Sequence, residues 1–303
     1  MQTTARNKAA GGAFRMKAVL ARTGGDPSGF LIGWELSMPG FRAFLSPLPR
    51  TLSQYGGLTV LPGYSQARQR IADGMLRAVY ENYDLGFVIT PPGVAFAPGR
   101  PHPDWTVVPR VSLVVDLSKD KDQIWSNVSR PARNRVRHAV GAGVGVDFVE
   151  GARALPDFLE LLGGVSTERH WGLPFGGAFF GDLLATFKGS SLIARATCGG
   201  ACVAGALLLY DKKTVYCHSF AATPEGRKLG APNLLHWSII NWAKGRGLST
   251  YDLLGANIPR IARFKRNMGG TDVRYSMIVF SRHQSLARLE RWALGFATSR
   301  ALS

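Results

Sequence analysis

The sequence predicts an α/β protein, and three observations carry that prediction. Strand-sized apolar runs alternate with segments of helical spacing along the chain. Three of these runs, separated by short glycine or polar turns, are expected to form a β-meander between Ser191 and Ala221. The chain has 303 residues and 46% hydrophobic content, so it can bury a large core in one large or two medium domains.

Residues 1–110 are expected to hold several strands and one long helix. The helix, from Ser65 to Tyr83, places Ile71, Met75 and Val79 on one side. Two segments rich in proline and glycine, 47–63 and 91–109, are expected to be loops. The expected strands are Phe14–Ala21, Phe30–Leu36, Phe41–Leu45 and Leu85–Thr90.

Residues 111–303 divide more clearly. The Ser118 hydroxyl is expected to cap a helix whose early acids, Asp120 and Asp122, suit the helix dipole. The other expected helices are Pro131–Val140, Leu155–Arg169, Pro232–Lys244 and Asn257–Met268. The expected strands are Val111–Leu117, Ser191–Cys198, Ala201–Tyr210, Thr214–Ala221, Ser249–Leu254 and Val273–Phe280, with a glycine-bearing loop over Pro224–Ala231.

The chain is strongly basic, with a formal net charge of +17 and a pI near 10.4. This excess favours a polyanionic partner, which is RNA, a nucleotide-bearing substrate or an anionic membrane surface. Three cysteines form no disulfide framework, and no metal site is expected. No apolar run reaches membrane-spanning length and the N-terminus lacks a signal-peptide core, so we expect a cytoplasmic protein.

The segment Arg130–His138 concentrates four arginines and a histidine in nine residues. Pro131 favours the first helical turn, and Gly141 is expected to end the helix. Because like charges do not stabilise a domain by crowding, this face is expected to bind an anion. Phosphate is the leading candidate, since guanidinium groups match its oxygens. The alternative is a solvated basic face on an ordinary helix.

The order of elements from Val111 to Phe280 resembles the Fem family, whose members take amino acids from aminoacyl-tRNA and contain two GNAT-like domains. The matching pieces are Val115-Asp116-Leu117, Arg133-x-Arg135-x-Arg137-x-Ala139, Gly143-Val144-x-Val146, Ala204-Gly205-Ala206, Tyr251-Asp252-x-x-Gly255-Ala256, Arg263-Phe264-Lys265 and Gly269-Gly270. The resemblance implies tandem GNAT-like domains, each a mixed, mostly antiparallel sheet flanked by helices. We place a degenerate N-terminal domain at 1–110 and a catalytic domain at 111–303.

The loop before the expected central helix separates two kinds of GNAT chemistry. Members of the superfamily that use coenzyme A carry Arg/Gln-x-x-Gly-x-Gly/Ala there, and its amides hold the pyrophosphate. This chain has Arg227-Lys228-Leu229-Gly230-Ala231-Pro232. Pro232 has no N–H to donate, which disfavours coenzyme A without excluding it. An ordinary loop that opens a helix at proline fits the same residues.

Three residues are predicted to be catalytic. Lys265 matches the lysine of the family's Phe-Lys motif, so the resemblance places it near the reacting ester or its phosphates. Asp252 ends a strand, where it either binds an amine, orients Lys265 or caps a loop. His236 is a candidate proton relay, although a lone histidine is more often structural.

Further residues are predicted to bind the substrates. The phosphate-binding candidates are Arg130, Arg133, Arg135, Arg137, Arg227, Lys228, Arg260, Arg263 and Arg266. The candidates for contact with the acceptor are Glu168, His170 and Trp171. The segment from Ser285 to Leu302 has an apolar helical face, which either packs on its own domain or contacts a membrane surface.

These observations predict an aminoacyl-tRNA-dependent aminoacyltransferase that forms an amide on an amine acceptor. The acceptor is expected to be a cell-wall precursor or a small natural-product metabolite. An aminoacyl ester is already activated, so no cofactor beyond the aminoacyl-tRNA co-substrate is expected. The alternatives are an N-acyltransferase of GNAT type that uses acetyl-CoA, and a GNAT-like module that binds RNA or membranes without catalysis.

Overall fold

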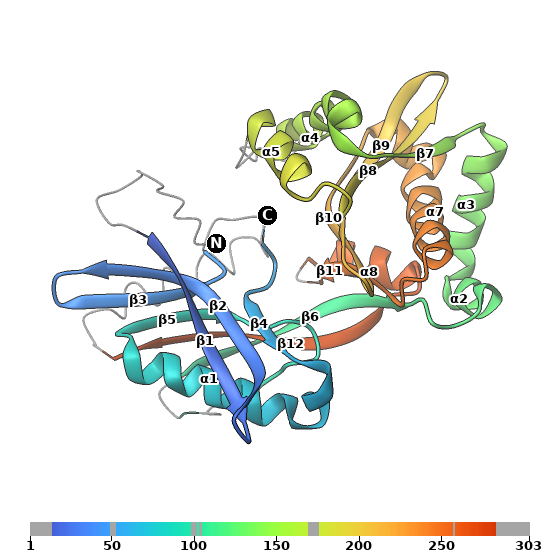
Figure 1. The fold of residues 1–303 in the computed structure, drawn as a ribbon. Helices are drawn as coiled ribbons and strands as arrows, with labels where there is room; N and C mark the ends of the chain where they lie inside the picture. The colour runs from blue at the N-terminus through green and yellow to red at the C-terminus, as the bar shows by residue number, and fades with distance from the viewer. Residues whose placement is uncertain are drawn as a thin grey trace. The chain divides into compact units, whose positions relative to one another are not determined.

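The computed structural model describes residues 14–48, 53–97, 102, 105–168, 176–256 and 258–282 (Figure 1). Contacts divide the chain into two compact units. Unit 1 runs to Ser112 and resumes at Val273, and unit 2 is Leu113–Asp272. This division differs from the expected one at the C-terminal end. The reason is that the last strand pairs with a strand near residue 87, a long-range contact that local patterns do not reveal.

Unit 1 is a mixed sheet covered by one long helix. Its strands follow the order β1-β2-β3-β5-β12, with β4 paired to β2. All of these pairs are antiparallel except β3 with β5, which is parallel. The elements are β1 Phe14–Thr23, β2 Asp26–Met38, β3 Phe41–Ser46, β4 Gly57–Val60, η1 Pro62–Ala67, α1 Arg68–Asn82, β5 Leu85–Ile89 and β12 Thr271–Ser281.

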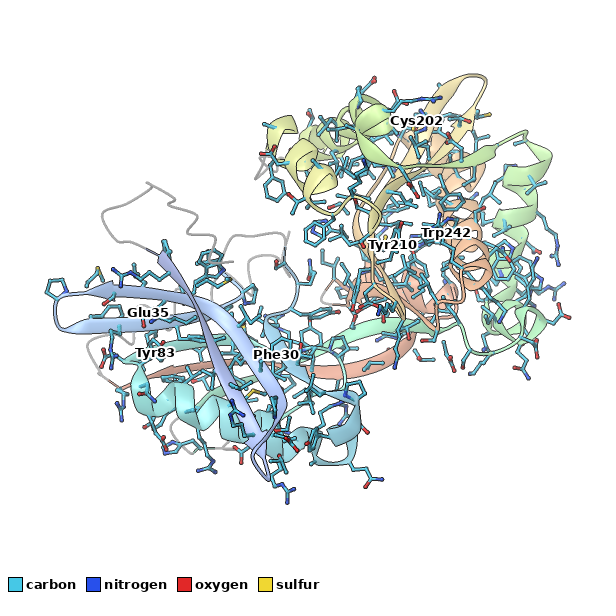
Figure 2. The ribbon with its side chains drawn as sticks, viewed as in Figure 1. Phe30, Glu35, Tyr83, Cys202, Tyr210 and Trp242 are labelled. Atoms are coloured by element: carbon cyan, nitrogen blue, oxygen red, sulfur yellow. The ribbon has the colours of Figure 1, made fainter. Side chains whose placement is uncertain are left out.

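The core of unit 1 forms where α1 packs on the sheet. The predicted apolar face of α1 is confirmed, because Ile71, Met75 and Val79 are all buried. They belong to one cluster with Phe44 and Phe280. Beside this core Tyr83 donates a hydrogen bond to the Glu35 carboxylate at 3.1 Å (Figure 2).

Unit 2 contains mixed, mostly antiparallel strands with helices on both faces. The strands follow the order β6-β11-β10-β9-β8-β7, in which β10 and β11 are parallel. In Figure 1, α3 and α7 lie on one side of these strands and α4 and α5 on the other. The elements are β6 Thr106–Asp116, α2 Lys121–Asn127, α3 Arg130–Gly141, β7 Gly145–Val149, η2 Gly151–Ala154, α4 Leu155–Glu168, α5 Gly177–Thr186, β8 Ser191–Cys198, β9 Ala201–Tyr210, β10 Thr214–Ala222, α6 Pro224–Leu229, α7 Ala231–Gly245, β11 Thr250–Gly255 and α8 Pro259–Asn267.

The central helix α7 is the largest contributor of buried side chains among the helices of unit 2. Leu235, Ile239 and Ala243 are fully buried in a cluster with the strands of the meander. At its outer end Trp242 packs edge-on against Tyr210, with ring centroids 5.3 Å apart (Figure 2). The helix is therefore fixed on the sheet by apolar burial rather than by its polar residues.

Several local details differ from the sequence predictions. The cap of α2 is Asp120, whose carboxylate accepts from the Gln123 amide at 2.7 Å, while the Ser118 hydroxyl donates to Asp116. The left-handed glycine after α3 is Gly143 rather than Gly141. The strand β4 and the helix α5 were not predicted, and the expected loop over Pro224–Ala231 contains the helix α6.

Candidate functional site

The candidate active site of unit 2 lies where two parallel strands diverge. The pairing of β10 with β11 runs only from Thr214 opposite Thr250 to Tyr216 opposite Asp252. Beyond that point β10 continues to Ala222 and β11 to Gly255 without pairing with one another. Divergence of two parallel strands leaves backbone groups available to side chains or substrate.

Lys265 on α8 points its ammonium group at the end of β11. Its Nζ donates to the carbonyl oxygens of Leu254 at 3.1 Å and Gly255 at 2.8 Å. An ammonium group has three N–H donors, so one remains for a further acceptor. Burial lowers the pKa of Lys265, and the nearby Cys217 and Asp252 oppose that shift. Lys265 is thus a half-buried cation with one donor to spare.

Asp252 holds the turn that carries those carbonyl groups. Its side chain is 2% exposed, and its Oδ1 accepts from the Leu254 amide at 2.7 Å. Leu254 has a φ of 63°, in the left-handed region that a leucine rarely adopts. The carboxylate and the ammonium of Lys265 therefore hold the same residue, one at its N–H and the other at its carbonyl oxygen.

His236 on α7 lies in the buried surroundings of Lys265. It is 3% exposed, and its Nδ1 lies 2.7 Å from the hydroxyl oxygen of Tyr251. Its ring stacks on Phe220 and also contacts Phe264. Burial, with a smaller contribution from the Lys265 charge, lowers the pKa of His236 to about 3. The imidazole is therefore neutral near pH 7 and is a weak base, so a structural hydrogen bond accounts for it better than the predicted proton relay.

The structure thus brings together the three residues that the sequence predicted to be catalytic. Two buried neighbours had been given no role in the site: Tyr251, whose hydroxyl oxygen lies 2.7 Å from His236 Nδ1, and Cys217 on β10. Burial raises the pKa of Cys217 to about 11, so the thiol stays protonated. Tyr251 stands in a motif that matches the family but was given no role, and a buried cysteine such as Cys217 resembles an ordinary core residue in the sequence.

His218 sits at a bulge in β10, between Cys217 and Ser219 in the pairing with β9. Its Nδ1 lies 3.1 Å from the Ser219 hydroxyl oxygen, and burial lowers the pKa of His218 to about 4. Bulges redirect a side chain out of the regular alternation of a strand. The bulge lies two residues after Tyr216, where the pairing of β10 with β11 ends.

Two of the predicted phosphate-binding arginines contact the ends of neighbouring helices. The Nη1 of Arg133 donates to the carbonyl oxygens of Ser126 at 3.1 Å and Val128 at 2.5 Å, at the end of α2. The guanidinium of Arg135 donates to the carbonyl oxygens of Arg227 at 2.8 Å and Lys228 at 3.0 Å, at the end of α6. Helix ends present unpaired carbonyl groups and partial negative charge, which these cations satisfy.

The remaining predicted cations differ in the partners that their side chains have within the protein. Arg266 forms two hydrogen bonds with Asp272, at 2.9 and 3.0 Å. Arg137 donates to Asn134, Arg227 to the Ala222 carbonyl oxygen, and Lys228 pairs with Glu225 at 3.8 Å. Arg130, Arg260 and Arg263 are exposed. The Ser129 amide donates to the Asn267 carbonyl oxygen at 2.9 Å, so the start of α3, which carries Arg130, adjoins the end of α8.

In the segment before α7, where coenzyme A enzymes bind pyrophosphate, two backbone amides form hydrogen bonds within the protein. The Gly226 amide donates to the Thr223 hydroxyl at 2.9 Å, and the Gly230 amide to the Arg227 carbonyl oxygen at 3.3 Å. The two glycines allow close packing. A Cβ atom at Gly226 would lie 2.2 Å from the Val203 carbonyl oxygen, and one at Gly230 would lie 2.6 Å from the Arg135 carbonyl oxygen. Packing therefore explains these glycines without a bound pyrophosphate.

The acceptor candidates mostly fall outside the described residues. The helix α4 ends at Glu168, and His170 and Trp171 lie beyond the described part of the chain. The same is true of Asn257 and of the segment from Ser285 to Leu302. Within the described residues, no three His, Cys, Asp or Glu side chains gather as metal ligands. The helices described are all too short or too polar to cross a membrane.

Comparison with known proteins finds a family model that matches the part of the chain containing this site. Residues 126–266 match the family model of the acetyltransferase (GNAT) domain. No curated protein matches the sequence. Residues 126–266 of unit 2 are therefore similar to GNAT domains, the class that the order of elements predicted.

Three solved structures share the fold over nearly the whole chain. FemX is 12% identical with a TM-score of 0.67, over 91% of this chain and 90% of FemX. The C-terminal domain of a putative lysylphosphatidylglycerol synthetase from Agrobacterium fabrum is 12% identical with a TM-score of 0.59, over 92% of this chain and 87% of that domain. L-PGS from Bacillus licheniformis is 11% identical with a TM-score of 0.54, over 95% and 88% of the two chains. The predicted Fem-like fold is therefore confirmed.

Proposed function

We propose that this protein transfers an aminoacyl group from aminoacyl-tRNA to an amine acceptor and forms an amide. The similarity to GNAT domains supports acyl transfer. The choice of donor rests on the segment that would cradle a pyrophosphate, because its Gly226 and Gly230 amides bond within the protein and it continues into Pro232, which has no N–H. A donor that is recognised through cations rather than through this loop suits the geometry better.

In the proposed reaction the amine nitrogen attacks the ester carbonyl carbon. Negative charge develops on the carbonyl oxygen, and the spare N–H of Lys265 is the donor best placed to stabilise it. The ester C–O bond then breaks, the ribose oxygen takes a proton, and the amine loses one. No general base is assigned, since His236 and His218 are both weak bases after burial.

The RNA phosphates would be bound by the exposed cations Arg130, Arg260 and Arg263, with Arg137 beside them. In this proposal Arg227, Lys228 and Arg266 provide weaker contacts, because each already has a protein partner. The acceptor would be a cell-wall precursor or a small natural-product metabolite, approached by Glu168, His170 and Trp171. A peripheral membrane contact of the segment from Ser285 to Leu302 belongs to the same proposal.

The experiment offers the purified protein charged total tRNA or acetyl-CoA, each with a panel of amines, and follows product masses. Product that depends on charged tRNA and disappears after RNase treatment supports the proposal. Product from acetyl-CoA alone, unaffected by RNase, would contradict it and establish the second candidate, N-acyl transfer from acetyl-CoA. The exposed turn variant Lys212→Ala, which keeps the site intact, serves as the control.

A further inference from the structure

Leu254 is the only residue other than glycine with a positive φ among the described residues. Its value of 63° brings the Cβ atom close to the carbonyl group of the preceding residue, a conformation that costs energy for a leucine. The side chain is buried, with 6% exposed, so the residue has no freedom to relax into solvent. Such a conformation persists only where its surroundings hold it from more than one side.

Two side chains hold this turn. Asp252 accepts from the Leu254 amide at 2.7 Å, two residues along the same strand. Lys265 donates to the Leu254 carbonyl oxygen at 3.1 Å, and also to Gly255 at 2.8 Å. The link from carboxylate to ammonium therefore runs through one residue, Leu254, whose N–H and carbonyl oxygen belong to the two peptide units on either side of its Cα atom. If Leu254 relaxed to an ordinary φ, the adjoining peptide would rotate and Lys265 would lose an acceptor.

We propose that Asp252 is a positioning residue, which acts through the left-handed turn at Leu254 to place the ammonium of Lys265. This inference rests on the proposed function only in giving Lys265 a catalytic role. It replaces the reading of Asp252 as a group that binds or deprotonates the amine. Asp252 is 2% exposed and one of its oxygens is committed to the turn, which suits a positioning role.

Variants at this turn separate a positioning role of Asp252 from direct binding or deprotonation of the amine by its carboxylate. Asp252→Asn keeps an oxygen acceptor for the Leu254 amide but removes the charge. Asp252→Ala removes both. Leu254→Gly removes the steric cost of the positive φ, because glycine adopts this region freely. The double variant Asp252→Ala/Leu254→Gly therefore restores the turn without restoring a carboxylate.

The activity readout is the kcat and KM of acyl transfer across pH. We expect Asp252→Ala to lower kcat by roughly tenfold or more with little change in KM, since placement of a transition-state donor is lost. Asp252→Asn and the double variant are expected to stay within about threefold of the parent at neutral pH. An Asp252→Asn variant as inactive as Asp252→Ala, or a folded double variant without recovery, would overturn the inference.

A second readout needs no substrate. The groups whose charges or burial act on Lys265 are Asp252, Cys217 and His236. Titration of Lys265 by NMR of isotope-labelled lysine compares Asp252→Asn, Asp252→Ala and the double variant, all of which lack the Asp252 charge. We expect the lowest pKa of Lys265 in Asp252→Ala, where the Leu254 carbonyl group no longer stabilises the ammonium, and matching higher values in the other two.

Equal pKa values of Lys265 in all three variants would contradict the inference. The titration also separates this failure from a failure of the proposed function, because it gives an answer even if no variant uses aminoacyl-tRNA. Asp116→Ala is the matched control. Asp116 also ends a strand, and it accepts a hydrogen bond from the Ser118 amide, two residues further on, at 3.0 Å. Asp116→Ala therefore tests whether the loss of any such turn changes the pKa of Lys265.

Discussion

Lys265 owes its position to two backbone carbonyl groups and its lowered pKa to burial. Neither could be obtained from the basic composition of α8, in which Lys265 is one of four cations within seven residues. Its neighbours Arg263 and Arg266 face solvent, whereas Lys265 turns toward the end of β11. The position of each cation around the axis of α8 therefore decides which one reaches the site.

Replacing Lys265 tests its role directly. We expect Lys265→Met, which keeps the apolar stem, to lower kcat by on the order of 10²-fold with a smaller effect on KM, because a donor to the developing oxyanion is lost. Steady-state kinetics of amide formation measure this effect. Retention of full activity by a folded Lys265→Met variant would remove the catalytic assignment.

His236 gives a prediction for stability against pH. Its pKa is about 3 in the folded protein against 6.5 for the free group, so the unfolded chain takes up a proton first as the pH falls. Stability is therefore lost below pH 6.5, and between pH 7 and 5 this one group accounts for about 2 kcal/mol. Urea unfolding at the two pH values should show His236→Gln losing less stability than the parent by roughly that amount. Equal losses would show that His236 does not titrate as described.

At the scale of elements, α3 ties together two helix ends. Arg133 satisfies carbonyl groups at the end of α2, and Arg135 does so at the end of α6. His138 adds a contact of 3.0 Å to the Leu229 carbonyl oxygen. Some cations of this helix thus bond to neighbouring helix ends, and others are exposed to solvent. Their spacing in the sequence does not show which cations do which.

The contact between α3 and α6 predicts that two substitutions on α3 have different effects on the free energy of unfolding. Arg135→Ala should lower the free energy of unfolding by about 1 kcal/mol, because two carbonyl groups lose a charged donor. Arg130→Ala, at the positively polarised start of the same helix, should leave stability unchanged or slightly higher. Chemical denaturation of both variants measures the difference. Equal destabilisation by the two substitutions would contradict the division of roles.

At the scale of the whole molecule, the net charge of +17 now has a partial explanation. Some cations serve helix ends or ion pairs, and others remain exposed on α3 and α8. The exposed ones lie on helices whose ends adjoin through Ser129 and Asn267. These exposed cations of unit 2 are the proposed contacts with RNA phosphates.

The salt dependence of RNA binding tests these contacts. We expect the double variant Arg260→Ala/Arg263→Ala to reduce the slope of log K against log salt by about 2, since roughly one counterion is released for each phosphate contact. Arg70→Ala/Arg77→Ala on α1 removes the same charge from unit 1 and should leave the slope nearly unchanged. Filter binding of tRNA at several salt concentrations measures both. Similar slopes for the two double variants would point to non-specific attraction.

Prediction from the sequence succeeded where the signal is local. The meander from Ser191 to Ala222 has almost the predicted bounds, because alternation and turn residues define each strand. The prediction was wrong over Pro224–Leu229, where glycines that serve close packing looked like a flexible loop. It also missed the short strand β4, whose pairing with β2 is the main reason that it is extended.

The sequence alone determined the class of the fold, the order of most elements in unit 2 and the identity of three residues that meet at one site. Periodicity, caps and motif spacing are properties of neighbouring residues, so they can be read from the chain. The tertiary structure decided which cations are free, which strand joins which unit, and that Leu254 is held in a left-handed turn between Asp252 and Lys265. These features depend on contacts between residues far apart in the chain or on a backbone angle that leucine does not favour by itself.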